Sequence, residues 1–146
     1  MTGRYYGEFE VGETIDHDKR RTITESDNQR FCDMTMNQQP LHLDAEFAAE
    51  TEFGERIVNG LYTMSLAVGL SVPDTTDGTI VANLAYDDVE HPAPVRLGDT
   101  LRARTTVTDK RETSDGDRGV VTMQVEAFVD DELVCSFDRT VLSLKR

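Results

Sequence analysis

Hydrophobic and polar residues alternate through the second half of the chain, which is the pattern of β-strands with one buried face. Acidic turns at Asp115-Gly116-Asp117 and Asp130-Asp131 indicate antiparallel hairpins between the later strands. A proline-containing connection from His91 to Asp99 joins the first two of the four predicted strands. The predicted strands are Thr79 to Val89, Thr100 to Lys110, Val120 to Asp130 and Leu133 to Leu144.

A different pattern precedes these strands, from Ile57 to Leu70. Its apolar residues cover most of a helical circumference, and small or hydroxyl-bearing residues fill the remainder. A helix that is apolar on nearly every side is a buried one. Pro73 follows closely and is expected to end it.

The first half predicts a strand-forming segment from Glu13 to Ile23 and two short helices. Thr24 caps the first, with Asp27 completing a capping box, and this helix ends near Met36. Pro40 excludes its preceding residue from the α region, so Asn37 to Asp44 is expected to be non-helical. Asp44 then caps a second helix that runs from Ala45 to Thr51.

Together these elements predict an α+β fold in which a curved antiparallel sheet wraps around a central buried helix. The 146 residues contain no repeat or linker, so a single domain spanning 1–146 is expected. A small open sheet leaves an edge strand unpaired. Pairing two such edges across a two-fold axis would cover them, which predicts a homodimer or a higher assembly of dimers.

Charge narrows the possible partners. The chain has 15 basic and 28 acidic residues, a net charge of −13, which argues against binding nucleic acid or an anionic membrane. No apolar run is long enough to span a bilayer, and the first twelve residues lack the pattern of a signal peptide.

The cysteines and the surface composition indicate where the protein works. Cys32 and Cys135 lie far apart, which fits reduced thiols in a cytoplasmic protein. Abundant carboxylates with little lysine are typical of a halophilic protein.

The candidate chemistry lies in Asn37-x-x-Pro40-x-His42-x-Asp44. An imidazole can take or give a proton near neutral pH, so His42 could act as an acid or base. The same residues also fit a loop in which His42 only donates to a backbone carbonyl, and spacing alone favours this loop. His17 and His91 lie in distant segments without metal-ligand spacing, so no metal site is expected.

Three segments in order resemble the MaoC-like family of (R)-specific enoyl-CoA hydratases and dehydratases, whose motif reads roughly D-x-N-P-x-H-x-D. They are Pro40 to Ala48, Phe53 to Gly60 and Pro94 to Leu101. The resemblance implies the hot-dog fold and reversible addition of water across the α,β double bond of an enoyl-CoA. It implies no cofactor beyond the CoA that the substrate carries.

The resemblance also implies roles for individual residues. His42 matches the histidine that activates the water. Gly60 matches the glycine whose N–H polarises the thioester carbonyl, a role that an unpaired helix N-terminus suits. Ser65 matches a serine of the central helix near the site, and Asn59 stands where many relatives carry a histidine.

One departure concerns the family's catalytic aspartate, which is replaced here by Asn37. An amide does not titrate, so Asn37 is expected to orient water or the thioester while His42 acts as the single acid/base. Relatives with asparagine in this place resemble proposed hydratases of branched C4-dicarboxylate thioesters such as mesaconyl-CoA.

The departure keeps two alternatives open, a non-catalytic acyl-CoA-binding hot-dog domain and an acyl-CoA thioesterase. For the thioesterase, Glu52 and Glu55 are loose candidates for the carboxylate that such enzymes place near the central helix. Four arginines could meet the CoA phosphates or pair with surface carboxylates instead: Arg56, Arg96, Arg102 and Arg104.

Overall fold

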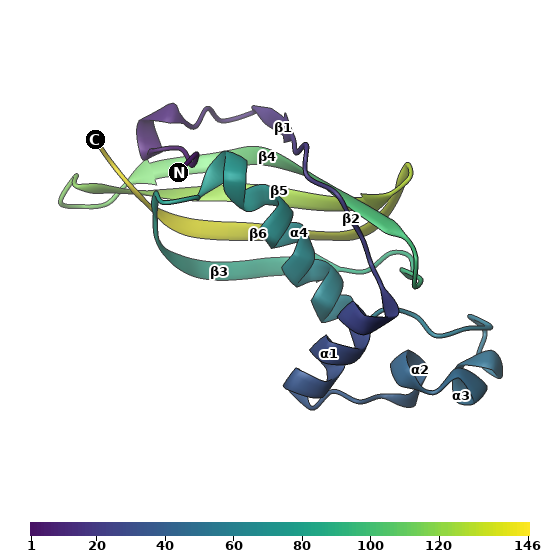
Figure 1. The fold of residues 1–146 in the computed structure, drawn as a ribbon. Helices are drawn as coiled ribbons and strands as arrows, with labels where there is room; N and C mark the ends of the chain where they lie inside the picture. The colour runs from purple at the N-terminus through teal and green to yellow at the C-terminus, as the bar shows by residue number, and fades with distance from the viewer.

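A curved antiparallel sheet forms the body of the protein in the computed structural model, which describes residues 1–146 (Figure 1). Its strand order is β1-β4-β5-β6-β3, and β2 also pairs with β4. The six strands are β1 (Thr14–Asp16), β2 (Arg21–Thr22), β3 (Ile80–Glu90), β4 (Thr100–Glu112), β5 (Arg118–Val129) and β6 (Glu132–Leu144). The four predicted strands are confirmed, and the segment from Glu13 to Ile23 contributes two short strands in place of one.

The central helix α4 (Gly60–Thr75) lies against one face of the sheet (Figure 1). Ala67 and Leu70 pack into a core with residues of β4, β5 and β6. The prediction that Pro73 ends the helix is wrong, since α4 continues for two more residues. Pro73 removes one hydrogen bond, to the carbonyl of Gly69, and Gly69 is exposed enough for water to replace that bond.

The predicted burial of the central helix holds on one side only. Because the sheet covers one face of α4, the opposite face stays open and Leu61 remains 54% exposed. The edge strand β3 is also largely exposed along its length. One face of α4 and the edge strand β3 are therefore both exposed, and both are rich in apolar residues.

Three short helices cluster beyond the N-terminal end of α4 (Figure 1). They are α1 (Glu25–Thr35), α2 (Pro40–Leu43) and α3 (Ala45–Ala49). The capping box of Thr24 and Asp27 is confirmed, as is the Asp44 cap of α3. A 3-10 turn, η1 (Tyr6–Glu8), lies in the N-terminal segment. None of the helices is both long and apolar enough to cross a membrane.

Candidate active site

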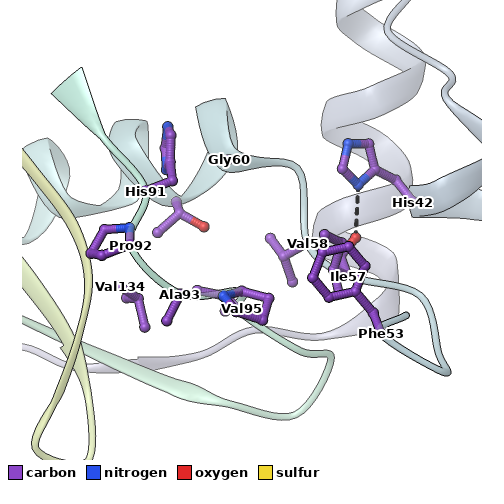
Figure 2. A pocket seen from close by; sticks show the side chains of 12 residues that line it. His42, Phe53, Ile57, Val58, Gly60, His91, Pro92, Ala93, Val95 and Val134 are labelled. Carbon is purple, nitrogen blue, oxygen red and sulfur yellow. Dashed lines mark hydrogen bonds between the residues drawn. The ribbon is translucent and has the colours of Figure 1, made fainter. Parts of the chain in front are cut away.

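A cavity of about 430 Å³ opens between the start of α4, the α2 turn and the loop that links β3 to β4. His42 and His91 face it from opposite sides, with apolar side chains such as Val58 between them (Figure 2). The lining includes no carboxylate, although the chain carries 28 acidic residues. Its two imidazoles are therefore its only ionisable side chains.

His42 lies on the single helical turn α2, where a non-helical segment was predicted. Gln39 has the extended backbone expected before a proline, with φ −58° and ψ 132°. Pro40 then occupies the first helical position, where its missing N–H costs nothing. The prediction failed because a proline that cannot continue a helix can still begin one.

The His42 ring is oriented by one hydrogen bond. Its Nδ1 lies 2.8 Å from the carbonyl oxygen of Ile57 (Figure 2). A carbonyl only accepts, so Nδ1 carries the proton and a neutral ring has its lone pair on Nε2. Nε2 has no partner within the chain, which leaves it available as a base.

The first turn of α4 presents one unpaired amide. The N–H groups of Leu61, Tyr62 and Thr63 are bonded to Asn59, whose side-chain oxygen accepts from Leu61 at 3.0 Å. The N–H of Gly60, which also lines the cavity, has no such partner. The positive end of the helix dipole and this free donor therefore meet at the cavity wall.

A buried side chain that the sequence did not single out joins these two segments. The Nδ2 of Asn28 donates to the carbonyl of His42 at 3.1 Å, and its Oδ1 accepts from the N–H of Asn59 at 3.0 Å. Asn28 is only 2% exposed, so these bonds have no competition from water. Asn28 thus fixes the α2 turn relative to the start of α4.

His91 is a second cavity residue that the sequence did not predict. A Cβ built on Gly60 would lie 3.0 Å from Cε1 of His91 and 3.2 Å from both ring nitrogens. The imidazole therefore packs directly over Gly60, and a larger residue at position 60 would displace it. No local signal predicts this contact, since 31 positions separate the two residues.

The remaining predicted site residues lie elsewhere. Asn59 is buried and caps α4, with its Nδ2 3.7 Å from the sulfur of Cys32. Ser65 lines a separate hollow with Leu61 and Tyr86, on the open face of α4. Asn37 is half-buried in the α1–α2 connection, and it does not line the His42 cavity. The structure thus brings His42 and Gly60 to one cavity and places the other three outside its lining.

Thr63, two residues before Ser65, does line the cavity. Two residues correspond to a rotation of about 200° around a helix, so Thr63 and Ser65 face opposite ways. Thr63 lies one turn after Gly60 and shares its face. The Thr63 hydroxyl is buried without a hydrogen-bond partner in the chain.

The four arginines proposed for CoA phosphates all pair with carboxylates. Arg56 contacts Glu25 at 3.1 Å, and Arg104 contacts Asp16 at 3.0 Å. Arg96 and Arg102 form longer pairs, at 3.5 and 3.4 Å. Each pair is partly exposed, so a phosphate could still compete for these cations. Nowhere do three potential metal-binding side chains come together.

The sequence of this chain is similar to those of several known proteins. Residues 8–129 match the family described as MaoC like domain. Mesaconyl-CoA hydratase from Cereibacter sphaeroides is 33% identical over 145 residues, covering 99% of this chain and 42% of the relative. The (R)-specific enoyl-CoA hydratase from Rhodospirillum rubrum is 33% identical over 107 residues, covering 71% of this chain and 69% of the relative.

A solved structure from Mycobacterium tuberculosis, described as a double hot-dog fold, superposes with a TM-score of 0.89 at 22% identity. The superposition covers 99% of this chain and 45% of that one, so the fold is confirmed as hot-dog. The chain spans less than half the length of the mesaconyl-CoA hydratase. The family match covers most of the chain and includes the His42 turn and the start of α4, so this chain belongs to the MaoC-like domain family.

Proposed function

We propose that this protein is a hydratase/dehydratase that adds water reversibly across the α,β double bond of an enoyl-CoA thioester. The observation that carries the proposal is that His42, with a free Nε2, and Gly60, with a free N–H, line one cavity. These are a proton carrier and an oxyanion donor, the two elements that addition to a conjugated thioester requires.

The reaction follows from these two groups. Nε2 of His42 takes a proton from water while the water oxygen bonds to the β-carbon and the π electrons move onto the thioester oxygen. The N–H of Gly60 and the dipole of α4 stabilise that enolate oxygen. The imidazolium then returns its proton to the α-carbon, so one group serves both steps and regenerates the neutral ring.

Asn37, Asn59 and Ser65 have supporting roles in this proposal. The Asn59 cap holds the first turn of α4 in place, so that the Gly60 N–H faces the cavity. Asn37 orients the water or the thioester on the approach to the α2 turn. Ser65 contacts the substrate from the open face of α4, where a second subunit would extend the site.

The proposed substrate is a branched C4-dicarboxylate thioester of the mesaconyl-CoA type. Sequence similarity to a mesaconyl-CoA hydratase over 99% of this chain supports it. A lining without carboxylates supports it as well, because the free carboxylate of the acyl group would meet no like charge there.

Purified protein should be incubated with mesaconyl-CoA and crotonyl-CoA, and loss of the conjugated thioester absorbance followed. Hydration of either by the wild type, and its loss in His42→Ala with the fold intact by circular dichroism, is the expected result. Release of free CoA without hydration would replace the proposal with a thioesterase. Binding with neither reaction would replace it with an acyl-CoA-binding domain.

The structure weighs against the thioesterase. Glu52 and Glu55 are exposed, and neither lines the cavity, so neither is placed to act as nucleophile or base beside His42. Glu55 is paired with Arg96 at 3.5 Å. The binding domain has no observation of its own in its favour, because binding alone would not need a free Nε2.

We further propose that one domain spans 1–146 and that two copies form a homodimer, alone or within a larger assembly. The β3 edge and the open face of α4 supply the apolar surface for this contact, with exposed residues Leu61, Val81, Leu84, Tyr86 and Val89. Two copies would also supply the pair of domains that a double hot-dog chain carries in one polypeptide.

Analytical ultracentrifugation tests the assembly. We expect at least twice the 16.4 kDa mass of one chain, and dissociation in Leu84→Glu, which places a charge on the β3 edge. Ser114→Glu, in the distant β4–β5 turn, is the matched control. A monomeric wild type at high salt would overturn the proposal.

The remaining proposals concern location and partners. Two buried free thiols support a cytoplasmic protein, and the net charge of −13 supports a halophilic one without nucleic-acid or membrane partners. The proposed reaction needs no cofactor, because CoA enters as part of the substrate.

A further inference from the structure

The cavity contains hydrogen-bond donors that the hydration reaction does not use. Proton transfer by His42 and enolate stabilisation by Gly60 leave the imidazole of His91 and the hydroxyl of Thr63 without a role. The cavity lining contains no carboxylate that could accept a hydrogen bond from either group.

The Thr63 hydroxyl points to a ligand. It is 1% exposed, it lines the cavity, and no acceptor or donor in the chain bonds to it. A buried polar atom without a partner costs about 1–3 kcal/mol, so such atoms are retained mainly where something else satisfies them.

His91 supplies the second observation. His91 is exposed, its ring lies over Gly60 with both nitrogens 3.2 Å from where a Cβ would be, and neither nitrogen is held by a hydrogen bond within the chain. An imidazole has at least one N–H in every protonation state that proteins hold at neutral pH, so His91 always offers a donor. Gly60 and Thr63 share one helix face, which places the His91 ring and the Thr63 hydroxyl at the same end of the cavity.

We propose that His91 and Thr63 form a subsite for a free carboxylate carried by the acyl group, beside the thioester held at Gly60. The proposal rests on the proposed hydratase function and adds the residues that select a dicarboxylate thioester over a plain enoyl-CoA. Carboxylate oxygens accept two or more hydrogen bonds, and the wall offers two side-chain donors with no competing anion. His42 lies on the opposite side of the cavity, so proton transfer and carboxylate recognition are assigned to different imidazoles.

The test is the ratio of kcat/KM for mesaconyl-CoA to kcat/KM for crotonyl-CoA, which lacks the free carboxylate. His91→Phe keeps a ring over Gly60 but removes both nitrogens, and Thr63→Val removes the hydroxyl at nearly constant volume. We expect each to lower the ratio by about 10- to 100-fold, the range for a hydrogen bond to a charged group.

Thr79→Val is the matched control, since Thr79 also carries a buried, unpartnered hydroxyl but lies outside the cavity. It should leave the ratio unchanged. An unchanged ratio in His91→Phe and Thr63→Val would overturn the carboxylate subsite, whether or not both activities fell together. A wild type that hydrates crotonyl-CoA but not mesaconyl-CoA would also overturn it while leaving the hydratase function intact. A wild type that hydrates neither would instead overturn the proposed function.

Discussion

Asn28→Leu offers the sharpest test of how the site is held together. The change removes the bond from Nδ2 to the His42 carbonyl and the bond that Oδ1 accepts from the Asn59 N–H. Leucine has the same number and branching of side-chain heavy atoms as asparagine, so the change leaves no cavity. The side chain is buried, so water cannot replace either bond without opening the structure.

The magnitude follows from the two groups left behind. A buried backbone group without a partner costs about 1–3 kcal/mol, so the two together cost about 2–6 kcal/mol. Added apolar burial by leucine offsets about 1 kcal/mol of this. We therefore expect the free energy of unfolding to fall by about 1–5 kcal/mol, against a typical domain stability of about 5–15 kcal/mol.

Urea unfolding followed by circular dichroism measures this loss, with Gln29→Leu on the same helix as control. The Gln29 side chain bonds only to Asp33 at the surface, and its replacement should change stability by less than about 0.5 kcal/mol. In the folded Asn28→Leu variant, kcat for hydration should fall about 10- to 100-fold with a smaller change in KM, because the His42 turn loses its register with α4. A stability loss equal to that of the control, or an unchanged kcat, would refute the reasoning.

Three further predictions concern proton transfer, pH and salt. His42→Gln should lower kcat by about 10²- to 10⁴-fold and Asn37→Ala by less than about tenfold; equal losses would contradict a single acid/base. Burial raises the pKa of the Cys135 thiol from 9.0 to about 11, so its contribution to stability is complete below pH 9 and is lost as pH rises to 11. Wild type should therefore lose about 2–3 kcal/mol more than Cys135→Ala over that range in urea titrations, and parallel curves would exclude this effect. With a net charge of −13, the urea midpoint should rise between 0.1 and 2 M KCl; a constant midpoint would argue against halophilic adaptation.

The sequence by itself determined the features that depend on near neighbours. The capping box of Thr24 and Asp27 and the Asp44 cap involve residues within three positions of each other. The hairpin turns at Gly116 and Asp130 follow from residues that tolerate positive φ, here 76° and 52°. His42 and Gly60 could be named in advance because their motifs are contiguous in the chain.

The rotation of α4 about its axis was decided by tertiary structure alone. A helix with apolar residues on nearly every side has no pattern that tells which face meets the sheet, so Ser65 and Thr63 were equally plausible from the sequence. Packing of Ala67 and Leu70 against the sheet fixed that rotation and turned Thr63 into the cavity. The contacts of Asn28 with the His42 turn and of His91 with Gly60 likewise join residues 14 and 31 positions apart, and only folding brings such pairs together.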